Sequence, residues 1–139
     1  MLSMKRSMLL CFGLLLCIAP AYSGKVDHSK GWSGMDGNDL LPMCQTGIEI
    51  SDGNGKNVSA SRSIDATHCS IYIQGFLDGI AVAQVAPGAT KILCFPEGVN
   101  GLQMVRVVVK WLQDHPARLH EPAYSCVFAA VHDAFACQP

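Results

Sequence analysis

Histidines and acidic residues are the side chains in this sequence that could act as general acids, general bases or metal ligands. A hydrolytic site needs a nucleophile, a base within hydrogen-bond reach and an orienting group, and zinc or redox sites commonly use ligands four residues apart on a helix or a C-x-x-C pair. None of the five histidines lies four residues from another, and no C-x-x-C occurs. The candidate catalytic or metal-binding residues are Asp78, Asp114, Asp133, His68, His115, His120 and His132, and their spacing matches neither kind of site. We therefore predict that the protein is not an enzyme and needs no metal or cofactor.

His115 and His120 flank a turn that follows a predicted helix. The last carbonyl groups of a helix have no partner within it. We expect the two histidines to hydrogen-bond these carbonyls, with contact to a partner protein as the alternative.

The N-terminus has the pattern of a secretory signal peptide. Lys5 and Arg6 precede an apolar run over residues 8–19, and Ala21-Tyr22-Ser23 supplies small residues for cleavage after Ser23. A run of about twelve residues is too short to cross a bilayer roughly 30 Å thick, and Leu16 before Cys17 is too bulky for a lipoprotein cleavage site. Residues 1–23 are thus predicted to be removed from an exported protein with no membrane anchor.

Removal of that segment changes the charge and the cysteine count. The mature chain keeps eight of the ten basic residues against 11 acidic ones, a net charge of −3, which disfavours nucleic acid as a partner. Two of the seven cysteines are lost with the signal peptide, and an oxidising compartment favours disulfides among the rest. The five that remain are Cys44, Cys69, Cys94, Cys126 and Cys137.

The C-terminal third predicts two helices around a short turn. Asn100 and Gln103 form the pattern of a capping box for a helix that Pro116 ends near residue 115. Pro122 suits the first turn of the next helix, which is apolar nearly all round and so expected to be buried or partly in a subunit interface. Because the turn is short, we expect these helices to be antiparallel.

The middle of the chain predicts two further helices. A brief one starts at Asn38 or Asp39 and passes through Cys44, residues 48–55 follow as a loop or small hairpin, and a core helix runs from Ser63 to about Gln84. Gly75 and Gly79 suggest that another backbone passes close to that helix. The predicted fold is therefore all-α, a single-domain bundle of about four helices over residues 38–139, preceded by a flexible arm at 24–37.

The expected positions of the cysteines relative to the helix ends limit which of them can form disulfides. Antiparallel packing brings Cys94 and Cys137 to one end of the C-terminal pair, whereas Cys126 lies roughly 16 Å away along its helix. Cys44 near the end of the first helix can meet Cys69 near the start of the second. We predict bridges Cys44–Cys69 and Cys94–Cys137, with Cys126 as a small buried hydrophobic residue.

A series of residues along the domain resembles the Rap/Tai family of type VI secretion immunity proteins over about residues 37–137. Ala136, where that family usually has proline, and the additional Cys126 depart from the pattern, and residues 46–62 match poorly. The residues that carry the resemblance are Leu40-Leu41, Cys44, Cys69, Tyr72-Ile73, Gly75, Asp78-Gly79, Cys94-x-Pro96, Gln103, Val107-Val108-Val109, Leu112, His115-Pro116, Leu119-His120 and Phe135-x-Cys137.

The resemblance implies a small helical periplasmic protein, often a homodimer, that binds a peptidoglycan amidase effector and plugs its catalytic groove. Because the apolar stripes commit the helices to their own core, we expect the contacts in the loops at 85–99 and 115–121. The residues expected to contact the effector are Glu97, Asp114, His115, His120 and Glu121. The alternative is a small, disulfide-stapled periplasmic chaperone or stress protein, which would share the export signal and fold class.

Overall fold

The computed structural model describes residues 34–53 and 57–138, so the predicted signal peptide and most of the predicted arm lie outside the described residues. The described part is helical, and its only β-type pairings are two isolated bridges, which confirms the all-α prediction. Its helices are α1 (Gly37–Ser51), α2 (Ala60–Gln84), α3 (Gly101–Asp114), the short 3-10 helix η2 (Pro116–Arg118) and α4 (Ala123–Phe135).

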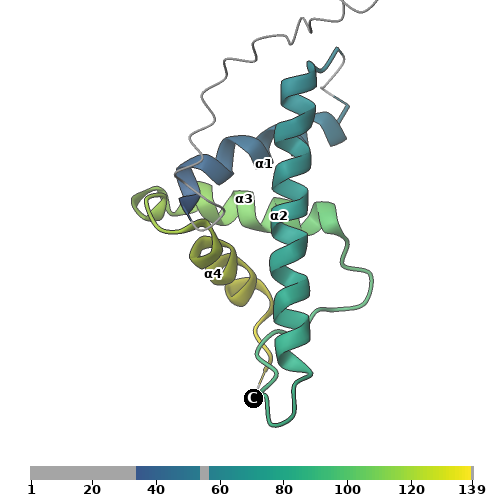
Figure 1. The fold of residues 1–139 in the computed structure, drawn as a ribbon, viewed down its shortest axis with the longest axis vertical. Helices are drawn as coiled ribbons and strands as arrows, with labels where there is room; N and C mark the ends of the chain where they lie inside the picture. Colours follow the sequence, from purple (N-terminus) through teal and green to yellow (C-terminus); the bar gives the residue numbers. More distant parts are fainter. Residues whose placement is uncertain (1–33, 54–56, 139) are drawn as a thin grey trace, which may run out of the picture.

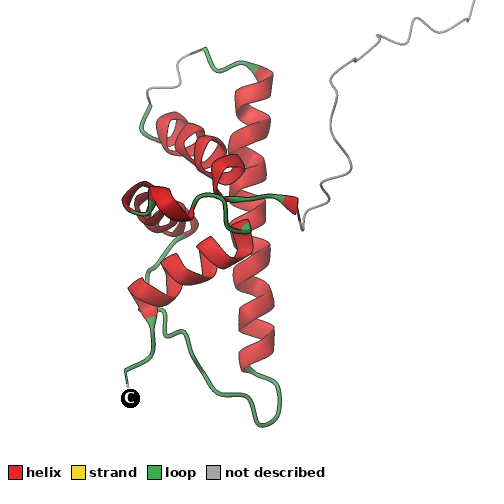
Figure 2. Cartoon of the chain, turned by 90° about the vertical axis from the view of Figure 1, so that its left-hand side faces the viewer, coloured by secondary structure: helices red, strands yellow, loops and turns green. Residues whose placement is uncertain are grey.

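The long helix α2 forms one side of the molecule; α1 and α3 cross it and pack against it, and α4 packs mainly against α3 and α1 (Figures 1 and 2). The core lies between them and is lined by apolar residues; on α3 these recur at helical spacing, as Val105, Val108, Val109 and Leu112. Its largest fully buried side chains are Leu40, Cys44, Cys69, Leu93, Val108, Leu112, Cys126, Val127 and Val131. In the described residues, no helix is both long and apolar enough to cross a membrane.

Helix α1 starts earlier and ends later than predicted. Asp36 caps it through a capping box with Asp39, in which each side chain accepts a hydrogen bond from the other residue's backbone N–H, at 3.1 and 3.3 Å. The helix continues to Ser51, so the prediction of a loop or hairpin at residues 48–50 was wrong. The physical reason is packing against α2, where the backbone of Gly47 lies beside Ala66.

Helix α2 also begins earlier than predicted, with Ser59 rather than Ser63 as its cap. The inference from Gly75 and Gly79 was wrong, because a Cβ atom added at either would meet nothing within 4 Å. The close approach occurs at Gly37, where an added Cβ atom would lie 3.0 Å from both Cα and O of Leu119. Gly37, the last residue of the predicted flexible arm, is instead the first residue of α1 and packs against Leu119.

Helix α3 begins as predicted, since the Asn100 side chain accepts from the Gln103 N–H at 3.0 Å, although Gln103 does not return the bond. The predicted antiparallel arrangement of α3 and α4 was wrong: Figure 2 views α3 nearly along its axis while α4 runs across the view. The turn between α3 and α4 packs against the start of α1, where the Gly37 N–H donates to the Glu121 carbonyl at 3.1 Å. This contact redirects the chain before α4 begins.

Both predicted disulfides are present. Cys44–Cys69 joins α1 to α2 with a Cα–Cα distance of 5.1 Å, and Cys94–Cys137 has a Cα–Cα distance of 4.9 Å. The Cys94–Cys137 bridge was predicted from an antiparallel arrangement of α3 and α4, which the structure does not have, so it forms for a different reason. The segment around Cys94 runs beside the end of α4, where the Cys94 N–H donates to the Phe135 carbonyl at 2.8 Å and the Cys137 N–H to the Ile92 carbonyl at 3.2 Å.

Candidate functional site

The four histidines in the described part of the chain lie apart from one another, at positions 68, 115, 120 and 132. His115 Nδ1 lies 2.7 Å from the Trp111 carbonyl, and its ring stacks on the Trp111 ring with centroids 4.2 Å apart. This confirms the helix-end role for His115, whereas His120 is exposed and makes no such bond. Among the described residues, no three His, Cys, Asp or Glu side chains are grouped so as to hold a metal ion.

The turn between α3 and α4 is built around Arg118. Its guanidinium donates to both carboxylate oxygens of Glu121, at 2.7 and 2.8 Å, and lies 4.7 Å from the centre of the Trp111 ring. The hydrogen bonds from Arg118 are the main reason that the pKa of Glu121 is lowered. The charge of Glu121 is therefore already paired within the turn, so it is less available to a partner than the sequence suggested.

The same turn is also held by α1 and α4. The Asn38 side chain and backbone N–H both donate to the Leu119 carbonyl at 3.0 Å. The buried Cys126 thiol points at the Arg118 and Glu121 carbonyls, with sulfur to oxygen distances of 3.7 and 3.8 Å, and burial raises its pKa. Cys126 was predicted to be a buried hydrophobic residue; it is buried, and in addition its thiol supports the turn.

The structure separates the five predicted contact residues into two groups. Asp114, His115, His120 and Glu121 lie together at the C-terminal end of α3. Glu97 lies beyond the other end of this 14-residue helix, which spans about 20 Å. The Asp114 carboxylate accepts from Lys110 at 2.7 Å on the surface, whereas Glu97 has no hydrogen-bond or ion-pair partner among the described residues. One compact site that contains all five is thus excluded.

The loop after α2 contains a feature that the sequence analysis missed. The Gln84 side-chain oxygen accepts from the backbone N–H groups of Ile92 and Leu93, both at 2.7 Å, and so closes the loop at 85–91. The end of α2 beside it is apolar and exposed, with 69% of Val82 and 81% of Val85 accessible to solvent. A Pro-Gly pair such as Pro87-Gly88 favours a break in the helix and a turn, but it gives no sign of this closure.

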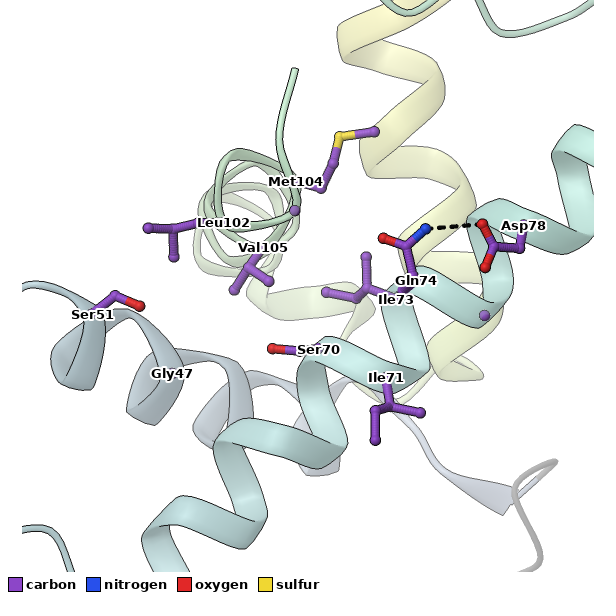
Figure 3. A pocket seen from close by; sticks show the side chains of 12 residues that line it. Gly47, Ser51, Ser70, Ile71, Ile73, Gln74, Asp78, Leu102, Met104 and Val105 are labelled. Atoms are coloured by element: carbon purple, nitrogen blue, oxygen red, sulfur yellow. Dashed lines mark hydrogen bonds between the residues drawn. The ribbon is translucent and has the colours of Figure 1, made fainter. Parts of the chain in front are cut away.

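A groove of about 580 Å³ lies between α1, α2 and α3 (Figure 3). Its walls are mostly apolar, with Ile71, Ile73 and Val105 among them, and its charged side chain is Asp78, which accepts from Gln74 at 2.9 Å. Because Asp78 has neither a second carboxylate nor a histidine beside it in the lining, the groove offers no acid–base pair. Its lining suits apolar groups.

The comparisons with known proteins decide the family. A family model described as Rap1a immunity proteins matches residues 36–137, which is nearly all of the described domain. The chain belongs to the Rap1a immunity protein family. No curated protein and no solved structure matches it. A member of this family is an immunity protein against a secreted effector; it acts by binding and is not an enzyme. The two disulfides fit an exported immunity protein.

Proposed function

We propose that this protein acts in the periplasm as an immunity protein that binds a peptidoglycan amidase delivered by type VI secretion and occludes its active site. The observation that carries this proposal is the family match over residues 36–137. The signal peptide pattern at residues 1–23 supports export. Inhibition of this kind protects the producing cell and its siblings from an effector that would otherwise cleave their peptidoglycan.

Binding, rather than chemistry, suits the surface described above. The turn at 115–121 is fixed from three sides, by Trp111, Asn38 and Cys126, so it can meet a partner without losing much conformational entropy. Glu97, which precedes the N-terminal end of α3, has no ion-pair partner within residues 34–53 and 57–138, and its charge would attract a basic effector surface. Such a charge speeds encounter more than it strengthens the final complex.

The direct test is inhibition of the amidase encoded beside this gene. Hydrolysis of purified peptidoglycan is measured while mature protein is added, and we expect it to stop at a stoichiometric ratio. Glu97→Lys should slow association, most clearly at low salt, and leave dissociation nearly unchanged. Asp78→Lys is the matched control, because Asp78 is an exposed carboxylate on α2 outside both loops. Full hydrolysis at a molar excess of wild-type protein would exclude this effector as the target.

We also propose that the protein is a homodimer that pairs through α4. The outer face of this helix exposes Tyr124 (49%) and Phe128 (37%), and the Phe128 ring lies 5.7 Å from that of His132. Aromatic side chains are enriched in the buried centres of interfaces. An aromatic face on a helix whose opposite face is in the core favours a second copy of the chain as its partner.

A periplasmic chaperone or stress protein would share the fold class and the disulfides. Such a protein binds many unfolded clients, whereas an immunity protein binds one folded enzyme tightly. Protection of several unrelated unfolded proteins from aggregation, without inhibition of any amidase, would favour the chaperone.

A further inference from the structure

We infer that Gln84 sets the shape of an effector-contacting tip formed by the end of α2 and the loop at 85–91, and that binding of the effector depends on this preset shape. The inference rests on the proposed function and names the element and the positioning residue that it needs. The tip is defined here as residues 82–91.

Three features fix the tip internally. The Gln84 oxygen accepts two consecutive backbone N–H groups, those of Ile92 and Leu93, at 2.7 Å each. Leu93 is 1% exposed, and Cys94 is bonded to Cys137, so the far end of the loop is anchored in the core. Gln84 therefore connects the C-terminal end of α2 to a segment that is anchored in the core.

The third feature is a turn at the end of the tip. The Ala89 N–H donates to the Ala86 carbonyl at 3.0 Å, Pro87 occupies the second position, and Gly88 has a φ of 79°. These are the requirements of a type II turn, in which proline presets one dihedral and glycine tolerates the positive φ. With its base closed by Gln84 and its end closed by this turn, the loop has little freedom left to lose on binding.

The surface of the tip has the character of the centre of an interface. Val82 and Val85 are among the most exposed apolar side chains of the described domain, at 69% and 81%. Lys91 is the only charged residue between Asp78 and Glu97. Depletion of charge is the compositional mark of interface centres, because removing a charge from water without a partner is costly. In a mature chain with net charge −3, this mostly apolar projection, whose one charged residue is Lys91 at its end, differs from the rest of the surface.

The position of the tip fits a recessed partner surface. Figure 1 shows the end of α2 and the following loop extending past α3 and α4 at the lower end of the molecule. Enzyme active sites are concave and mostly apolar, so a convex, rigid, apolar element is complementary to them. The occupant that we assign to this tip is accordingly the substrate cleft of the amidase.

The experiment separates closure of the loop from contact by the tip. Gln84→Ala removes the acceptor, Gln84→Glu keeps an oxygen in its place, and Gln74→Ala is the control for a glutamine on the same helix whose hydrogen bond lies outside the tip. Val85→Asp tests contact directly, with Ile64→Asp, 50% exposed near the other end of α2, as its control. Amide hydrogen exchange of Ile92 and Leu93 is measured on each mature protein, and affinity is measured for the amidase encoded beside the gene.

We expect Gln84→Ala to speed amide exchange at Ile92 and Leu93, but not at Cys94. It should also weaken amidase binding about ten- to thirtyfold, because the loss of two hydrogen bonds lowers the fraction of molecules in which the loop is closed. Gln84→Glu should stay close to wild type in both measurements. Val85→Asp should weaken binding at least tenfold with exchange unchanged, and the two controls should bind normally.

Each contrary result has its own meaning. Faster exchange in Gln84→Ala with unaltered affinity, or normal binding by Val85→Asp, would overturn the inference and leave the proposed function intact. Unchanged exchange in Gln84→Ala would show that the side chain does not close the loop. Absence of binding by the wild type would overturn the proposed function, and the role of the tip with it, whatever the exchange rates are.

Discussion

Two glycines show how the surroundings of a single residue decide the effect of one methyl group. At Gly37, an added Cβ atom would come within 3.0 Å of backbone atoms of Leu119, so Gly37→Ala must shift the turn or the start of α1. We expect it to lower the free energy of unfolding by about 1–3 kcal/mol. At Gly75, where the Cβ atom meets open space, Gly75→Ala should stabilise the helix by about 0.5–1 kcal/mol. Chemical denaturation of both variants beside wild type measures the two effects, and equal changes would contradict the packing assigned to Gly37.

The pair Arg118–Glu121 predicts a pH dependence at the residue scale. Hydrogen bonds from Arg118 lower the pKa of Glu121 in the folded state below its ordinary value of 4.5. A depressed folded-state pKa means that the stabilising effect is present above the unfolded-state pKa and is lost as the pH falls through the folded-state pKa. Glu121→Gln should therefore be less stable than wild type at neutral pH, with the difference vanishing in acid. Unfolding midpoints from pH 7 down to pH 2 test this; a difference that persists at low pH would mean that the charge is not its source.

At the scale of elements, the Cys94–Cys137 bridge ties the segment before α3 to the end of α4. Replacing both Cys94 and Cys137 by serine releases the loop and should cost about 4 kcal/mol by the chain-entropy estimate for the 43 residues that separate them. Denaturant unfolding of the double variant against wild type measures the loss. A loss below 1 kcal/mol would indicate that the contacts of Leu93 and Phe135 hold this end without the bridge.

Cys126 provides an independent check on the same elements. It is fully buried, and burial raises the pKa of its thiol, so little of the reactive thiolate is available in the folded protein. We expect an alkylating reagent to label Cys126 only after unfolding, and unreduced peptide maps to contain the pairs Cys44–Cys69 and Cys94–Cys137. Rapid labelling of the native protein, or a bridge to Cys126, would contradict the packing of α4 against the turn.

At the scale of the whole molecule, the proposed homodimer predicts that one charge on α4 produces monomers. Phe128→Asp places an uncompensated charge on the exposed aromatic face, and because Phe128 is 37% exposed the fold should survive. Sedimentation or light scattering should find a dimer for wild type, a monomer for Phe128→Asp and a dimer for Ile64→Asp on the remote end of α2. A wild-type monomer at micromolar concentration would remove α4 as a subunit interface.

The sequence by itself determined the features that depend on local spacing. The valines of α3, the Asn100 cap and the prolines that bound the turn all act over a few residues, and each predicted a helix or a helix end that the structure contains. The pairing of the cysteines was also predicted correctly, although the Cys94–Cys137 bridge rests on packing that the predicted helix geometry did not supply. The resemblance to the immunity family was likewise visible, since it depends on the order and spacing of such residues.

Only the tertiary structure decided how those elements meet. The extension of α1, the crossing of α3 and α4, the close approach at Gly37 and the closure of the loop by Gln84 all depend on contacts between segments far apart in the chain or on one side chain's choice of partner. The sequence does not distinguish Gly37, which lies against Leu119, from Gly75, whose Cα faces open space. The partner, and therefore the energy, is set by packing that no local pattern records.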